Sequence, residues 1–146
     1  MSADSTLRGL QVALAAEHAV IWGYGLVGAK IGDGRRARVR QADLAHRARR
    51  DATAATIRGR GGDPVDSRAA YHVPFPVTDE RSALRLAVHL EEGAARAWHY
   101  LLGATSEAPV RTDAVGALSD SAVQATMWRA ALNPADAAVA FPGGKP

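Results

Sequence analysis

The sequence contains no cysteine, and this absence excludes several kinds of site. A chain without cysteine has no disulfide, no thiolate metal ligand and no cysteine nucleophile. Aromatic residues make up only 5% of the 146 residues, so small and aliphatic side chains must supply most of the core. Such side chains suit helices that pack closely together. At this length we expect a single domain, residues 1–146, with a sizeable core.

The chain also lacks the charge pattern of a secretory or membrane segment. Its N-terminus, MSADSTLRGL, has no positively charged region before an apolar run. Residues 12–31 are long enough to span a bilayer, but Glu17 and His18 lie within them and no flanking charges support insertion. We therefore expect a cytoplasmic protein with no membrane partner. The frequent alanine and arginine are typical of a GC-rich bacterial genome.

The net charge of +3 comes mostly from arginines that are concentrated in one region. They lie in the segments GRRARVR (34–40) and HRARR (46–50). A basic patch of this kind is one sign of a nucleic-acid binder. A charge run more often solvates the outer face of a helix, and we favour that interpretation here. Nucleic acid is therefore not the expected partner.

Glycine- and proline-rich segments divide the chain into four stretches with the spacing of amphipathic helices. The expected helices cover residues 6–31, 36–57, 79–104 and 112–132. The tail, residues 133–146, ends in proline and glycine and is expected to be irregular. In the last helix we expect Val115, Leu118, Ala122, Ala125 and either Trp128 or Arg129 to face inward. The segment LSDS (118–121) is a candidate break within it.

The lengths of the three connections predict how the helices are arranged. The first and third connections are short, so each joins two antiparallel neighbours. The second has about twenty residues, which is long for a compact domain. It contains YHVPFPV (71–77), whose apolar side chains we expect to pack on the bundle. An all-α four-helix bundle with one long crossover between helices 2 and 3 has the ferritin-like layout.

Three ionisable residues lie near the middle of three expected helices, on the faces predicted to point inward. They are Glu17, His46 and Glu91, and Asp43 precedes His46 by three residues on the same helix face. Di-metal carboxylate bundles use one Glu from each of two helices and a Glu-x-x-His from each of the other two. These residues would supply about half of such a site.

The other half of a di-metal site is missing from the sequence. The helix at 112–132 has no histidine and no Glu-x-x-His. Asp43 stands where the pattern has Glu, and Arg50, one turn beyond His46, places a positive charge where a metal would repel it. Neither GYGLVG (23–28) nor GRGG (59–62) lies between a strand and a helix, as a phosphate-binding loop requires.

Four segments resemble a known family when they are taken in order. They are LQVALAAEHAVIWGYGLVGA (10–29), HRARRD (46–51), YHVPFPVTD (71–79) and LEEGAARAW (90–98). They are similar to an actinobacterial ferritin-like domain family of unknown function, over about residues 10–128. The resemblance implies a ferritin-like four-helix fold and no established activity. The family pattern is matched here at Glu17, His18, His46, Arg50, Asp51 and Glu91.

Three interpretations of the polar centre remain open at this point. Glu17, His46, Arg50 and Glu91, with Asp43 nearby, would form a buried ion-pair network in place of a lost metal site. Alternatively, Glu17, His46 and Glu91 would bind iron, manganese or zinc in a metal-binding protein or metal-dependent oxidoreductase. A pocket for a small molecule is the third. We favour the network, with no metal, cofactor or catalytic residue, in an interaction or scaffold protein. A homodimer fits its small-residue helix faces.

Overall fold

The computed structural model describes residues 2–144 and is built from four long helices. No strand occurs within this range, so the predicted all-α class is confirmed. Two single 3-10 turns, η1 (Asp33–Arg35) and η2 (Pro134–Asp136), follow the first and last long helices. The long helices are α1 (Ala3–Lys30), α2 (Arg36–Gly59), α3 (Glu80–Ala104) and α4 (Ala108–Leu132).

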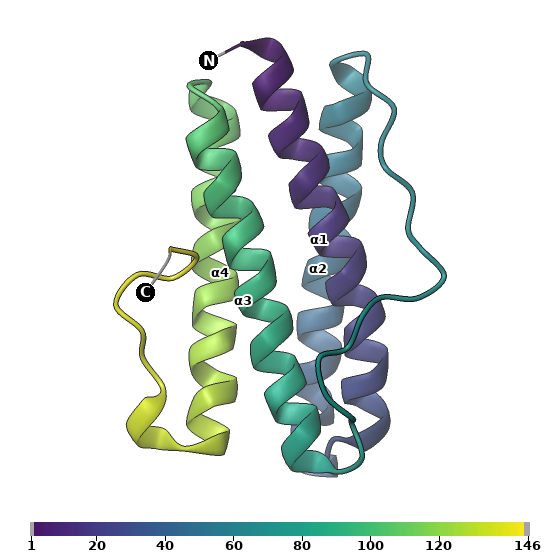
Figure 1. The fold of residues 1–146 in the computed structure, drawn as a ribbon, viewed down its shortest axis with the longest axis vertical. Coiled ribbons are helices and arrows are strands. Elements are labelled where there is room, and N and C mark those ends of the chain that lie inside the picture. Colours follow the sequence, from purple (N-terminus) through teal and green to yellow (C-terminus); the bar gives the residue numbers. More distant parts are fainter. Residues whose placement is uncertain (1, 145–146) are drawn as a thin grey trace.

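The helices form two antiparallel hairpins joined by a crossover that runs the length of the bundle (Figure 1). Short links join α1 to α2 and α3 to α4, whereas about twenty residues without helix separate α2 from α3. α1 packs against both α2 and α3, and α3 packs against α4, while α2 and α4 make little direct contact. The predicted short-long-short layout is confirmed.

Local sequence signals explain where α3 and α4 begin. Asp79 caps α3 in a capping box, in which its side chain accepts from the backbone N–H of Ser82 at 2.8 Å. α4 begins at Ala108, four residues before the predicted start, and its first turn contains Pro109. A proline is tolerated there, since its missing N–H would have no partner within the helix.

The predicted inward face of α4 was partly wrong. The helix continues through residues 118–121 without a break. Val115 was expected to face inward but is 51% exposed, and Ala114 and Ala117 are buried in its place. Between Val110 and Trp128, the buried face of α4 consists of small side chains, which give a weak periodic signal in the sequence.

Close packing between α1 and α3 depends on glycine at two positions of α1. A Cβ added at Gly23 would lie 2.5 Å from a methyl carbon of Leu90, and one added at Gly9 would lie 2.7 Å from a methyl carbon of Leu101. Both distances are too short for real carbon contacts. The glycines therefore let α3 approach α1 closely enough to bring their central side chains together.

The crossover covers one side of the bundle with its apolar side chains. The rings of Tyr71 and Trp22 lie 5.8 Å apart, and the guanidinium of Arg85 lies 4.3 Å from the centre of the Phe75 ring. Val73 and Phe75 are half-buried against the core. This segment therefore lies against the helices, although it contains no regular structure.

Two further features concern α1 and the tail. α1 is long and apolar enough to cross a membrane by length and composition alone, and in the structure it forms part of the bundle core. After η2 the described tail is irregular up to residue 144 and contacts α3, where Gly143 lies close to the backbone of Ala95. Residues 1, 145 and 146 of the predicted single domain lie outside the described residues.

Candidate functional site: a buried imidazole between two carboxylates

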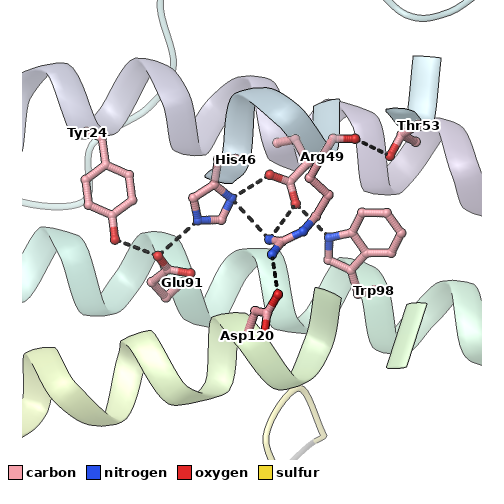
Figure 2. A network of polar contacts seen from close by, with 8 residues as sticks. Tyr24, His46, Arg49, Thr53, Glu91, Trp98 and Asp120 are labelled. Atoms are coloured by element: carbon pink, nitrogen blue, oxygen red, sulfur yellow. Dashed lines mark hydrogen bonds and ion pairs between the residues drawn. The ribbon is translucent and has the colours of Figure 1, made fainter. Parts of the chain in front are cut away.

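The centre of the bundle contains an imidazole placed between two carboxylates (Figure 2). The residues are Glu17 from α1, His46 from α2 and Glu91 from α3, and none is more than 2% exposed. His46 Nδ1 lies 2.5 Å from Glu17 Oε2, and His46 Nε2 lies 3.0 Å from Glu91 Oε1. Each ring nitrogen therefore has a carboxylate oxygen as its partner.

This geometry indicates that His46 carries two protons. A carboxylate oxygen accepts hydrogen bonds, so both Nδ1 and Nε2 must donate, and only the imidazolium form can do so. Burial by itself would lower the pKa of His46, but its hydrogen bonds to Glu17 and Glu91 and their negative charges outweigh that effect and raise the pKa to about 9. The imidazolium is therefore the main form at neutral pH.

Glu17 is surrounded by donors on every side. Burial raises its pKa, but its hydrogen bond to His46 and the nearby cations outweigh burial and lower the pKa below its usual value. Trp98 donates its indole N–H to Glu17 Oε1 at 2.7 Å, and Arg49 Nη1 approaches the same oxygen at 3.5 Å. Arg49 in turn donates to Asp120 of α4 at 3.1 Å.

Two cations lie close together beside Glu17. Arg49 Nη1 is 3.4 Å from His46 Nδ1, a contact that Figure 2 also marks. When His46 is an imidazolium, both nitrogens carry hydrogens and neither accepts from the other. Glu17 therefore lies between two positive groups, His46 and Arg49. The four central groups, two carboxylates, one imidazolium and one guanidinium, have a net charge of zero. A balanced set of this kind keeps the cost of burying charge low.

A second chain of hydrogen bonds connects Glu91 to α1 and α4. Tyr24 donates its hydroxyl to Glu91 Oε1 at 2.5 Å, and Trp128 donates its indole N–H to the Tyr24 oxygen at 2.9 Å. Burial and the neighbouring Glu91 carboxylate raise the pKa of Tyr24 well above 10. The phenol therefore keeps its proton and acts as a donor.

The structure places two of the predicted site residues outside this network. Arg50 was expected at the centre, but its Nε donates to Asp51 at 2.8 Å near the surface, and Arg49 supplies the central guanidinium instead. Arg49 and Arg50 follow His46 by three and four positions, so they lie on either side of it on the helix surface. α2 is rotated so that Arg49 faces α1 and α4. Asp43 accepts from Arg47 at 2.8 Å on the outer side of α2.

Sequence reasoning missed the polar roles of three aromatic residues. No polar role was predicted from the sequence for Tyr24, Trp98 or Trp128. A signal was available, because a buried tyrosine or tryptophan usually needs a partner for its O–H or N–H. Tyr24 also follows Glu17 by two helical turns, which places both on the same face of α1.

The central groups do not fit a di-metal site. A metal ligand must offer a free lone pair, and an imidazolium has none. Both oxygens of Glu17 already accept hydrogen bonds, from His46 on one side and from Trp98 and Arg49 on the other. Within residues 2–144, no three histidine or carboxylate side chains are arranged to hold a metal ion. His46 itself lies between the two carboxylates.

Comparisons with solved structures agree on the fold. A conserved hypothetical protein from Mycobacterium tuberculosis is 36% identical, with a TM-score of 0.88 over 90% of this chain and all of that chain. A protein from Bacillus anthracis described as ferritin-like and diiron-carboxylate is 18% identical, with a TM-score of 0.73 over 91% of this chain and all of that chain.

A third structure, a dodecameric thioferritin described as a bacterioferritin-related protein from Bacteroides fragilis, is 19% identical. Its TM-score is 0.77, over 92% of this chain and 88% of that chain. A comparison with curated proteins found no match. Residues 9–146 match a family that is described as a domain of unknown function, DUF4439, and the chain therefore belongs to this family, whose fold here is a ferritin-like four-helix bundle.

Proposed function

We propose that this protein is a non-catalytic ferritin-like bundle that acts as an interaction or scaffold protein, and that its central charged groups stabilise the fold without a metal. The observation that carries the proposal is the position of His46, whose two ring nitrogens each face a buried carboxylate oxygen. In this arrangement the imidazolium provides the positive charge that a metal ion would otherwise have to provide.

The protonation of His46 works against metal binding at neutral pH. A histidine must lose its second proton before it can bind a metal. Because the pKa of His46 is raised to about 9, at pH 7 the proton weakens metal binding at this ligand by about 100-fold. Arg49 adds a second positive charge 3.5 Å from Glu17 Oε1. Iron, manganese and zinc are therefore not expected as cofactors.

Metal analysis of the purified protein tests the proposal. We expect well below one equivalent of iron, manganese or zinc in protein purified without a chelator. Reconstitution with each metal should leave the free energy of unfolding unchanged. One or two equivalents that disappear in both Glu17→Ala and His46→Ala, but persist in the exposed control His89→Ala, would overturn the proposal. That result would support the alternative, a metal-binding protein or metal-dependent oxidoreductase.

The sequence-based expectations about setting and partners remain part of this proposal. They are an actinobacterial source, a cytoplasmic location, no membrane partner and assembly into a homodimer. The thioferritin from Bacteroides fragilis is a dodecamer, so a bundle of this fold assembles with further copies in that protein. Light scattering after size-exclusion chromatography would test the homodimer, since a monomer at all accessible concentrations would contradict it.

A further inference from the structure

A pocket opens between α2 and α4, at the point where these helices make little direct contact. Its volume is about 190 Å³. Gln41, His46 and Arg49 line it from α2, and Asp120, Ser121 and Gln124 line it from α4. Glu91 of α3 reaches it from the bundle centre, so the pocket adjoins the charged network. Figure 2 shows two contacts among these residues, from Arg49 of α2 to Asp120 of α4 and from His46 to Glu91 of α3.

Three residues that line the pocket each carry a buried polar atom that has no hydrogen-bond partner in the protein. These atoms are Glu91 Oε2, Ser121 Oγ and Gln124 Oε1, and no other buried side-chain polar atom of the described residues lacks a partner. Leaving such a group buried without a partner is unfavourable. Glu91 is fully buried and Ser121 is 1% exposed. The three residues line one pocket, so one partner bound there would satisfy all three atoms.

The chemistry of the three atoms indicates the kind of partner. A carboxylate oxygen and an amide oxygen only accept hydrogen bonds, and a hydroxyl can accept as well. Ser121 and Gln124 lie three residues apart on α4, so they share one helix face. A group that satisfies all three must carry several N–H or O–H donors. A protonated primary amine carries three N–H donors on one nitrogen.

The second oxygen of Glu91 favours a cationic partner. The charged residues that line the pocket balance one another, with Glu91 and Asp120 negative and His46 and Arg49 positive. Arg49 is already engaged by Glu17 and Asp120, whereas the second oxygen of Glu91 is not engaged. A hydrogen bond between an ammonium group and this carboxylate would be charge-assisted and thus stronger than a neutral one.

We propose that the α2–α4 pocket binds a small primary alkylammonium compound, whose nitrogen donates to Glu91 Oε2, Ser121 Oγ and Gln124 Oε1. An engineered cavity of about 150 Å³ holds benzene, so a pocket of this size accommodates a ligand of about five to seven heavy atoms. The alkyl chain would lie along Ala42 and Ala45 of α2, which also line the pocket. The site shares Glu91 with the alternative metal site, but it uses Oε2 of this carboxylate, whereas Oε1 holds His46.

Calorimetric titration with n-butylammonium chloride tests this site. The protein is kept in EDTA at constant ionic strength, so that a metal on Glu91 does not compete. We expect saturable binding of one equivalent. Ser121→Ala should weaken it by about tenfold or more, because one charge-assisted hydrogen bond is lost. Gln124→Met should weaken it in the same way, and the matched control Ser119→Ala, on the exposed face of α4, should leave it unchanged.

Two further probes separate the ammonium group from the alkyl chain. n-Butanol has a similar shape without the charge, and tetramethylammonium has the charge without an N–H, so both should bind at least tenfold more weakly. Absence of saturable binding of butylammonium would mean that water satisfies the three atoms, and would overturn the proposal. Equal binding of butanol, or equal binding to Ser121→Ala and the wild type, would overturn it as well.

Discussion

Raising the pH should destabilise the folded bundle through one buried group. His46 has a pKa of about 9 in the folded protein and about 6.5 when it is exposed in the unfolded chain. A group whose pKa is raised by folding contributes stability that is fully present below pH 6.5. That contribution is lost as the pH rises through 9. The difference corresponds to about 3 kcal/mol, a large part of the 5–15 kcal/mol that is typical of a folded domain.

Urea denaturation followed by far-UV circular dichroism measures this effect. The free energy of unfolding of the wild type should be about 3 kcal/mol lower at pH 9.5 than at pH 6.5. In His46→Gln the titrating group is gone, so the difference between the two pH values should shrink to less than about 1 kcal/mol. His89→Gln, which changes an exposed histidine of α3, should retain the full difference.

Two results would refute this reasoning. Parallel pH profiles for the wild type and His46→Gln would show that His46 does not take up its proton on folding. A wild-type stability that rises between pH 6.5 and 9.5 would point to a neutral His46 that binds a metal, because metal ligands bind more tightly once they are deprotonated. The sign of the pH dependence therefore distinguishes a charged imidazolium from a metal ligand.

Two further predictions use matched pairs of variants. Arg49→Met should lower the free energy of unfolding by about 1–3 kcal/mol, because it removes a cation from the buried Glu17, whereas Arg50→Met should change it by less than about 0.5 kcal/mol. Equal effects in urea denaturation would contradict the assignment of the central guanidinium. Phe75→Ala should cost about 1–3 kcal/mol, since its ring is half-buried under Arg85, and the 79% exposed Phe141 should tolerate alanine with little loss. A melting temperature of Phe75→Ala equal to that of the wild type would mean that the crossover contributes no packing.

The fold could be predicted because its signals are local and periodic. Helical spacing and connection lengths each depend on short stretches of sequence. The same spacing placed Glu17, His46 and Glu91 on inward faces, and the structure brings these three side chains together. The two carboxylates stand out there because the residues around them on the buried faces of α1 and α3 are mostly apolar or small.

The parts of the site that could not be predicted depend on the rotation of one helix against another. α2 is rich in alanine on several faces, so its sequence does not determine whether Arg49 or Arg50 turns inward. α4 has the same ambiguity, and Val115 is exposed where an inward position was expected. The pocket between α2 and α4 also depends on this rotation, since Ser121 and Gln124 carry no motif of their own.

The central claim, that His46 is a buried imidazolium between two carboxylates, is tested most directly by nitrogen-15 NMR of its imidazole ring at pH 7. In metal-free protein we expect both ring nitrogens to show the chemical shifts of protonated nitrogens, with a single titration near pH 9. One equivalent of Zn²⁺ should leave both signals unchanged. A ring nitrogen with the shift of an unprotonated nitrogen, or a shift of either signal on addition of Zn²⁺, would contradict the claim.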